Sequence, residues 1–244
     1  DADSFFASVE SAKNPALFGK PVITGSERGI ATSMSYEAKE LGINRGMPVF
    51  MIRKNFPQVV IVSSDYEAYA MYSRRMFAIV RRYTDLVEEY SIDECFADIT
   101  DYDHINNMSH EQILRNIQDD IQKELNISVS IGCGPTKVLA KVGSKWNKPH
   151  GIAMITKENF HEFLSKLPIE NVWGIGASST NLLTKKGIDT ADDFANLSEK
   201  RLLSFAHKPL IDLWYELNCK QKHILDIKPG ENPKSISRTL SFYP

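Results

Sequence analysis

The chain lacks several features that mark specialised classes of protein. No apolar run in its 244 residues approaches the length of a membrane span, and no stretch has the pattern of a signal peptide. Its three cysteines, Cys95, Cys133 and Cys219, are odd in number and far apart. This argues against a disulfide framework or a zinc knuckle and suits a reducing cytosol. Repeats and low-complexity tracts are also missing, so we expect an ordinary globular protein with one large domain or two to three small ones.

A large excess of either charge is missing too, because the net charge is −2. Locally, however, no acidic residue occurs between Glu124 and Glu158. The lysines of that window are Lys137, Lys141, Lys145, Lys148 and Lys157. The first four are spaced to lie along one side of a helix and its end, where like charges repel. A solvated helix face is one interpretation, but such faces usually include acidic residues, so we favour contact with a polyanion for this basic strip.

The hydrophobic pattern from residue 65 onward predicts six elements in the order helix, strand, strand, helix, strand, helix. Their predicted ranges are 65–84, 86–92, 94–100, 109–126, 127–134 and 135–146. In the second helix Ile113, Ile117 and Ile121 share one face, and Ser109 suits the N-cap. If the first residues end an opening strand, the order becomes βαββαβ, a ferredoxin-like arrangement within an α+β fold.

The remaining segments predict an insertion and a helical third part. The insertion carries three strand-like stretches, "PVITGS", "GIATSM" and "VVIVSS", and a helix at "YEAKELG". In the third part a hydrophobic turn precedes Gly174-Ile175-Gly176, a helix then stops at Gly187, and a second helix starts near Asp189 or Thr190. We expect both ends of the chain to be truncated. The predicted boundaries are 1–7 and 65–155 for the ferredoxin-like part, 8–64 for the insertion, 156–222 for the helical part and 223–244 for a linker.

The stretch "YSIDECFADIT", residues 90–100, places two carboxylates inside strand-like sequence. Asp93 and Glu94 can converge only at a hairpin turn or a bulge, because neighbours on a straight strand point to opposite faces. Such a hairpin would lie beside the opening strand, which carries Asp1 and Asp3. Three carboxylates held close need cations, and hard oxygen ligands suit Mg²⁺. Solvated charges at a hairpin tip are the alternative, but the hydrophobic flanks favour a two-metal site formed by Asp1, Asp93 and Glu94.

Two further stretches allow a functional and a structural interpretation. The sequence "GIGASS", with Gly174, Gly176 and Ser178, places main-chain N–H groups at a helix N-terminus, which is a ready anion site. An ordinary joint between two helices is the alternative, but beside the basic strip and the predicted metal site we favour contact with a DNA backbone, independent of sequence. Phe5 and Phe6 are core residues by default, with stacking against a nucleotide sugar as the alternative.

The motifs together resemble one family. "DADSFFASVE", "YEAKELGINRGMP", "YSIDE" with "FADIT", "KVLAKVGSKWNKPHG" and "VWGIG" occur in the order expected of Y-family, UmuC/DinB-like translesion DNA polymerases. The match runs over essentially the whole chain, and the set is specific although no single motif is. The resemblance implies a right-hand polymerase core with a ferredoxin-like palm, small fingers and a thumb with a helix–hairpin–helix.

The resemblance also implies roles for individual residues. The implied metal ligands are the carboxylates of Asp1, Asp93 and Glu94 and the carbonyl oxygen of Ala2. They would bind two Mg²⁺ ions, for which Mn²⁺ could substitute. Phe6 matches the steric gate that rejects a ribose 2′-OH, and Phe5 lies beside it. The triphosphate contacts are Tyr36, Lys39 and Lys148, with Ser33 near the phosphates. The DNA contacts predicted from the basic strip and the hairpin are Lys137, Lys141, Lys145, Gly174, Gly176 and Ser178.

Some positions depart from the family. It usually has Arg at the position of Lys39, and Lys keeps the charge without the bidentate fork, so the phosphate grip should be looser. Asp3 is common at its position, and we interpret it as structural rather than as a metal ligand. The hydrophobic strand before Asp1, the little-finger domain after "KSISRTLSF" and any clamp-binding peptide are absent from this sequence.

The sequence therefore predicts a low-fidelity, template-directed DNA polymerase that acts in damage tolerance. Its expected partners are primer–template DNA, a dNTP and a sliding clamp reached through a C-terminal region, with no membrane partner. We expect it in the cytoplasm, associated with the nucleoid if the source is bacterial. The alternatives are a palm-fold nucleotidyl cyclase, which would not need the helical hairpin or the lysines, and a non-catalytic DNA-binding paralogue, which would be expected to lose a carboxylate.

Overall fold

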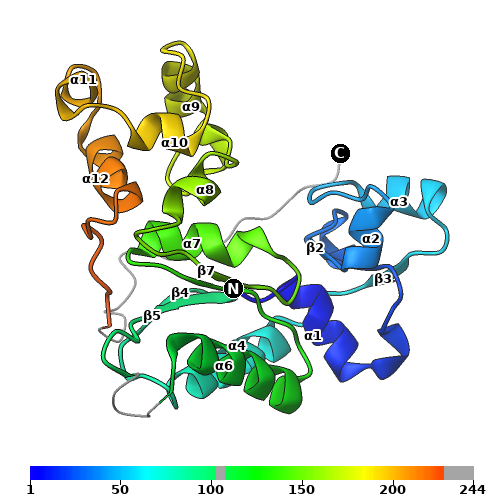
Figure 1. Cartoon of the computed structure of the whole chain (residues 1–244). Coiled ribbons are helices and arrows are strands. Elements are labelled where there is room, and N and C mark those ends of the chain that lie inside the picture. The colour runs from blue at the N-terminus through cyan, green and yellow to red at the C-terminus, as the bar shows by residue number, and fades with distance from the viewer. Residues whose placement is uncertain (103–107, 228–244) are drawn as a thin grey trace. The chain divides into compact units, whose positions relative to one another are not determined.

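The computed structural model describes residues 1–102 and 108–227 (Figure 1). The chain forms two compact units. The first unit comprises residue 1 with 109–118 and 130–225, and the second comprises 2–108, 119–129 and the residues from 226 onward. The linker predicted over 223–244 is described only as far as residue 227, and "KSISRTLSFYP" lies outside the described residues. None of the helices formed by the described residues has the length and apolarity needed to cross a bilayer.

A short helix, α1 (Phe5–Lys13), opens the second unit, where the sequence did not predict one. Ser4 precedes it with φ 49°, a left-handed conformation that sets the direction of the helix. Phe5 and Val9 lie one helical turn apart and are buried, which explains why the segment packs as a helix. The helix runs without a break through residues 7 and 8, where the sequence placed a domain boundary. A 3₁₀ turn, Pro15–Leu17, follows it.

A small sheet and two helices make up the predicted insertion. The strands are β1 (Val22–Thr24), β2 (Ser33–Met34) and β3 (Val60–Val62), in the order β2-β1-β3. β1 pairs antiparallel with β2 and parallel with β3, and a 3₁₀ turn, Ser26–Arg28, joins β1 to β2. Helix α2 (Tyr36–Glu40) confirms the predicted helix. Helix α3 (Val49–Asn55) was not predicted, because its exposed Phe50 and Met51 mask the helical pattern of its buried residues.

A long helix and a hairpin follow in the predicted order. Helix α4 (Tyr66–Val80) follows Asp65, whose side chain caps its N-terminus by accepting the N–H of Ala68. Strands β4 (Val87–Ser91) and β5 (Glu94–Ala97) pair antiparallel, with a register shift near the turn. The opening segment forms only an isolated antiparallel bridge between Ala2 and Val129 rather than a full strand. The ferredoxin-like order is thus confirmed, with its first strand reduced to one residue pair.

Helix α6 (His110–Leu125) passes from the first unit to the second, with Ser109 as its confirmed N-cap. In the first unit, β6 (Ile131–Cys133) pairs in parallel with β7 (Ile152–Met154) and lies against helix α7 (Lys137–Trp146). This contact requires glycine at position 132, because a Cβ there would lie 2.0 Å from the Ala140 carbonyl oxygen. The close approach fixes α7 on the sheet.

The C-terminal helices of the first unit gather above α7 in yellow and orange in Figure 1. They are α8 (Phe160–Leu164), α9 (Ala177–Thr184), α10 (Ala191–Ala195), α11 (Glu199–Leu203) and α12 (Lys208–Leu217), with a 3₁₀ turn at Ile169–Asn171. Val138 and Leu139 of α7 share one hydrophobic core with Leu164, Phe194 and Leu213. Packing therefore continues across residue 155, where the sequence placed the start of the helical part.

Candidate active site

Asp1 lies in the first unit between two lysines. Its main chain is fixed by Ser130, whose N–H donates to the Asp1 carbonyl oxygen at 2.9 Å. The Lys141 ammonium lies 2.5 Å from Asp1 Oδ2, and Lys148 donates to Oδ1. Both oxygens of this carboxylate therefore face positive charge, in a setting where the Asp1 side chain is largely shielded from water.

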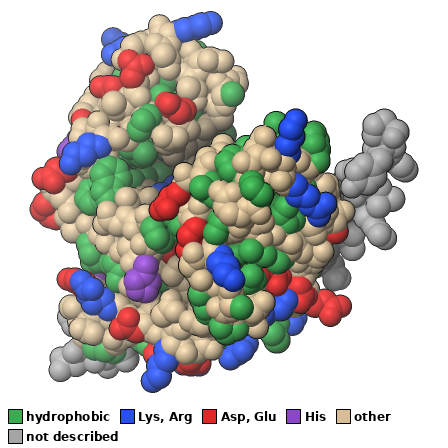
Figure 2. All heavy atoms as spheres, turned by 90° about the vertical axis from the view of Figure 1, so that its right-hand side faces the viewer, with side chains coloured by type: hydrophobic (Ala, Val, Ile, Leu, Met, Phe, Trp, Pro, Cys, Tyr) green, Lys and Arg blue, Asp and Glu red, His purple; other side chains and the backbone are tan. Residues whose placement is uncertain are grey.

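The lysines of the predicted basic strip do not all lie at the surface, because Lys141 is buried. Lys141 is only 8% exposed, and its ammonium is turned to Asp1 rather than to solvent. Lys145 is exposed and Lys137 half-buried on the same helix. The helical spacing was right, but tertiary packing divides these lysines between the interior and the surface. On the face shown in Figure 2, blue basic side chains are mixed with red acidic ones, in keeping with the net charge of −2.

Asp93 and Glu94 lie at the turn of the β4–β5 hairpin in the second unit, as the sequence predicted. Ser91 pairs with Glu94 across the turn, and the Ser91 hydroxyl donates to Asp93 Oδ1 at 2.6 Å. The Ala2 N–H donates to the Asp93 carbonyl oxygen at 2.8 Å. Both acidic side chains are half-buried. The opening segment and the hairpin are thus joined through their main chains.

The chemistry of these groups fits a hard divalent cation. Carboxylate oxygens are the donors that Mg²⁺ prefers, and in this structure both oxygens of Asp1 pair with lysines. Within the described residues, no three His, Cys, Asp or Glu side chains are arranged to hold a metal ion together. The assignment of Asp1, Ala2, Asp93 and Glu94 to metal binding stays a prediction.

Asp3 is buried in the second unit and uses its carboxylate for internal contacts. Ser128 donates from its hydroxyl to Asp3 Oδ2 at 3.1 Å, and the Tyr36 hydroxyl lies 3.5 Å from Oδ1. These contacts favour the structural interpretation of Asp3 over the ligand interpretation. Burial, with the nearby Asp3 carboxylate adding to it, raises the pKa of Tyr36 to about 12, so Tyr36 stays a neutral donor at physiological pH.

Ser4 joins two of the predicted phosphate-binding residues. Lys39 donates to the Ser4 hydroxyl at 2.8 Å, and the buried Ser33 hydroxyl donates to the Ser4 carbonyl oxygen at 3.4 Å. The Lys39 ammonium also lies 4.0 Å from the centre of the Tyr36 ring. Ser33, Tyr36 and Lys39 therefore lie close together around Ser4. Sequence reasoning missed Ser4, and its left-handed backbone, the one signal of its position, is visible only in the structure.

Phe5 and Phe6 differ in their surroundings. Phe5 is buried in the core, as the default interpretation predicted, whereas Phe6 is half-buried. The Phe6 ring stacks on Tyr69 with centroids 4.2 Å apart and an interplanar angle of 8°. Tyr69 is completely buried and donates its hydroxyl to Glu10 at 2.8 Å. Tyr69 thus supports one face of Phe6, a role that sequence periodicity alone did not reveal.

The helical hairpin of the first unit confirms the predicted turn. Gly176 caps α9, and Gly174 and Gly187 both have positive φ, at 95° and 72°. Gly174, Gly176 and Ser178 are exposed, so the main-chain N–H groups at the start of α9 face solvent. Thr190 caps the second helix, α10, as predicted. This geometry suits the binding of an anion, but it does not specify which anion.

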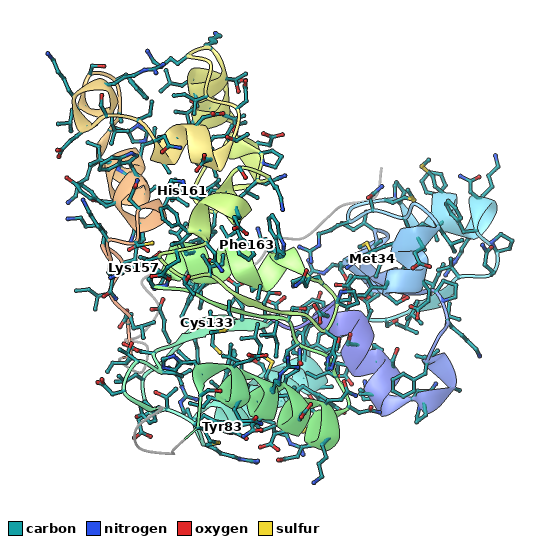
Figure 3. The ribbon with its side chains drawn as sticks, viewed as in Figure 1. Met34, Tyr83, Cys133, Lys157, His161 and Phe163 are labelled. Atoms are coloured by element: carbon teal, nitrogen blue, oxygen red, sulfur yellow. The ribbon has the colours of Figure 1, made fainter. Side chains whose placement is uncertain are left out.

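Side-chain contacts brace the same hairpin. His161, labelled on α8 in Figure 3, lies with its Nδ1 2.5 Å from Asp192 Oδ1 on α10. At the base of α12, the buried carboxylate of Glu216 accepts main-chain N–H groups from residues 138, 222 and 223. Sequence reasoning did not identify Glu216, because its partners are distant in sequence or lie in an irregular segment.

Comparisons with known proteins agree with the motifs. Residues 1–145, more than half of the chain, match the impB/mucB/samB family. DNA polymerase IV of Streptococcus pyogenes serotype M5 (strain Manfredo) is 38% identical over 220 residues, which cover 88% of this chain and 60% of the relative. DNA polymerase IV of Streptococcus pneumoniae serotype 2 (strain D39 / NCTC 7466) is 35% identical over 250 residues, covering 99% and 69%.

Solved structures show the same likeness. The Dbh ternary complex superposes with a TM-score of 0.77 at 28% identity, covering 89% of this chain and 65% of that one. A Y-family DNA polymerase chimera of Dbh and Dpo4 gives a TM-score of 0.78 at 28% identity, covering 92% and 69%. The chain spans roughly three fifths to two thirds of the length of these relatives. It belongs to the impB/mucB/samB family, the Y-family that its motifs predict.

Proposed function

We propose that the chain is the catalytic part of a low-fidelity DNA polymerase that copies damaged templates. The reaction is transfer of a nucleotide from a dNTP to a primer 3′-OH, with loss of pyrophosphate. The observation that carries the proposal is the hydrogen bond from the Ala2 N–H to the Asp93 carbonyl oxygen. Because Ala2 follows Asp1 directly, this bond links the segment that begins with one acidic residue to the hairpin that carries two more. The matched DNA polymerase IV relatives support the same activity.

The carboxylates of Asp1, Asp93 and Glu94, with the Ala2 carbonyl oxygen, would hold two Mg²⁺ ions, for which Mn²⁺ could substitute. When bound, such ions activate the attacking 3′-oxygen and offset the charge that develops on the phosphate. The chain's own contribution is to hold these oxygens in place: Ser130 fixes the main chain of Asp1, and the Ser91 hydroxyl orients Asp93.

The residues around Ser4 would bind the nucleotide. Tyr36, as a neutral hydroxyl, and Lys39, as a cation, would contact the triphosphate, with Ser33 beside them. Lys148 would approach the phosphates from the palm. Phe6, held by Tyr69, would press against C2′ of the sugar and leave neither space nor a hydrogen-bond partner for a 2′-OH. Lys39 binds as a point charge without the fork of an arginine.

The first unit would hold the primer–template. The exposed Lys145 and the main-chain N–H groups that follow Gly174 and Gly176 suit contact with DNA phosphates, independent of sequence. Lys137 adds a half-buried cation on the same helix. The structural relative Dbh has been solved as a ternary complex with its substrates, which supports DNA and a dNTP as ligands here. A sliding clamp would bind outside the described residues, and we place the protein in the cytoplasm, near the nucleoid in a bacterium.

Primer extension by the full-length protein tests the proposal. Asp93→Ala and Glu94→Ala should each abolish extension with Mg²⁺ while leaving the circular dichroism spectrum and the melting temperature close to those of the wild type. Glu89→Ala, on the same hairpin, is the matched control and should retain activity. A protein that binds primer–template but never extends it would be a non-catalytic paralogue. Extension at wild-type rate by both acidic variants would refute the metal assignment.

A further inference from the structure

Glu10 is a buried carboxylate of the second unit that the proposed mechanism does not use. It lies on α1, one helical turn after Phe6 and on the same face of the helix. Its Oε1 accepts the Tyr69 hydroxyl at 2.8 Å, and its Oε2 lies 3.2 Å from the Lys13 ammonium. Both oxygens have partners within the unit, so the Glu10 side chain is held in one position.

The contacts of Glu10 continue to a second helix. The Lys13 ammonium also lies 2.5 Å from Asp65 Oδ2. Asp65 caps α4, the helix that carries Tyr66 and Tyr69, and α4 lies against α1 (Figure 1). Glu10, Lys13 and Asp65 therefore form a chain of charged groups that joins the two helices directly beside their aromatic side chains.

Phe6 rests on the ring that this chain of charges holds. Phe6 and Tyr69 stack with centroids 4.2 Å apart, which is close contact, so Phe6 can move toward Tyr69 only if Tyr69 moves as well. Tyr66 meets both rings edge-to-face, with centroid distances of 6.0 and 5.7 Å. Burial raises the pKa of Tyr69, so its hydroxyl stays neutral and continues to donate to Glu10 at physiological pH.

We infer that Glu10 is a positioning residue for sugar selection: by holding the Tyr69 hydroxyl, it limits how far Phe6 can yield to a ribose 2′-OH. The inference rests on the proposed function for the place of Phe6 at the sugar. Displacing the Phe6 ring requires Tyr69 to move away from its bond with Glu10. A hydrogen bond to a charged group corresponds to a factor of about ten to a hundred in an equilibrium constant. Glu10 thus acts through Tyr69 and Phe6, without touching the nucleotide.

The test compares the Kd values of dATP and ATP for the full-length protein with Mg²⁺, by isothermal titration calorimetry. The primer–template has T as the next template base and a primer that ends in a dideoxynucleotide, so sugar preference is measured without chemistry. Glu10→Ala should reduce the preference for dATP about tenfold, mainly through tighter binding of ATP. Tyr69→Phe, which keeps the ring without the donor, should reduce it equally, and the double variant no further. Glu10→Gln, which keeps an acceptor oxygen, should stay near the wild type.

A loss of stability alone would not reproduce this pattern. Ile79→Val removes a buried methyl group about three helical turns from Tyr69 on α4, so it should melt earlier and keep the wild-type sugar preference. An unchanged preference in Glu10→Ala would overturn the inference, even if the protein extends primers, and so would an equal change in Ile79→Val. The expected pattern in a protein that extends no primer with a free 3′-OH would instead support the positioning role and refute the polymerase function.

Discussion

Glu216 on α12 offers the sharpest test of how the first unit is held together. Its side chain is completely buried. Oε1 accepts the N–H groups of Lys222 and His223, at 2.5 and 2.7 Å, and Oε2 accepts the N–H of Val138 at 3.3 Å. The Glu216 carbonyl oxygen also accepts the Thr136 hydroxyl at 2.9 Å. One residue thus joins α12, the start of α7 and the chain that leaves the helices.

Glu216→Ala removes the acceptor of three main-chain donors. A hydrogen bond to a charged group contributes about 1.5–3 kcal/mol, and an orphaned buried donor costs about as much. The N–H groups of Lys222 and His223 can regain water, because Lys222 lies at the surface, whereas the N–H of Val138 remains buried. We therefore expect a loss of about 3 kcal/mol in the free energy of unfolding of the first unit, or a fall of about 12–24 °C in the melting temperature of a unit of this size.

Tryptophan fluorescence is the assay that isolates this effect. The three tryptophans of the chain, Trp146, Trp173 and Trp214, all lie in the first unit, so their emission during urea or thermal unfolding reports on that unit. Glu216→Gln keeps one acceptor oxygen but turns an NH₂ group toward main-chain donors, and should cost about half as much. Glu162→Ala, an exposed substitution in the same unit, should be nearly neutral. A Glu216→Ala variant within about 0.5 kcal/mol of the wild type, the size of an ordinary surface substitution, would refute the reasoning.

Three other outcomes follow from the geometry. Tyr69→Phe leaves the buried side chain of Glu10 without its hydroxyl donor, so urea unfolding should show a loss of about 1.5–3 kcal/mol; no loss would mean that the bond contributes little. Gly132→Ala places a methyl group against main-chain atoms of α7 and should destabilise the first unit by about 1–3 kcal/mol, seen as an earlier melting transition by tryptophan fluorescence. A hydrogen bond from the Thr190 side chain, helped by the Thr190 main-chain N–H, holds the pKa of Asp193 below its usual range, so its stabilisation is present above about pH 4 and is lost as the pH falls further. The stability advantage of the wild type over Asp193→Asn should therefore be constant at neutral pH and disappear in acid, and a pH-independent difference would contradict the capping role.

The sequence by itself determined most of the local structure. The order α4, β4, β5, α6, β6, α7 follows from alternation and helical spacing, which depend only on near neighbours. The caps at Ser109 and Thr190 and the hairpin turn at Asp93 are likewise local, because each satisfies a main-chain group within a few residues. The candidate site residues could be named from the sequence because they lie within the family motifs, and each motif is a short run of chain.

Only the tertiary structure decided which side chains those local elements bury. Lys141 fits an exposed helix face by spacing, yet it is buried because Asp1, 140 residues away in sequence, provides the compensating charge. Helix α1 was not foreseen because it depends on the left-handed Ser4, a conformation that no residue type there demands. Tyr69 orients Phe6, although the two are 63 residues apart in the chain. Glu216 accepts the N–H of Val138 and so anchors the N-terminal end of α7, although these two are 78 residues apart. Such contacts form only when distant segments fold together, so periodicity along the sequence contains no trace of them.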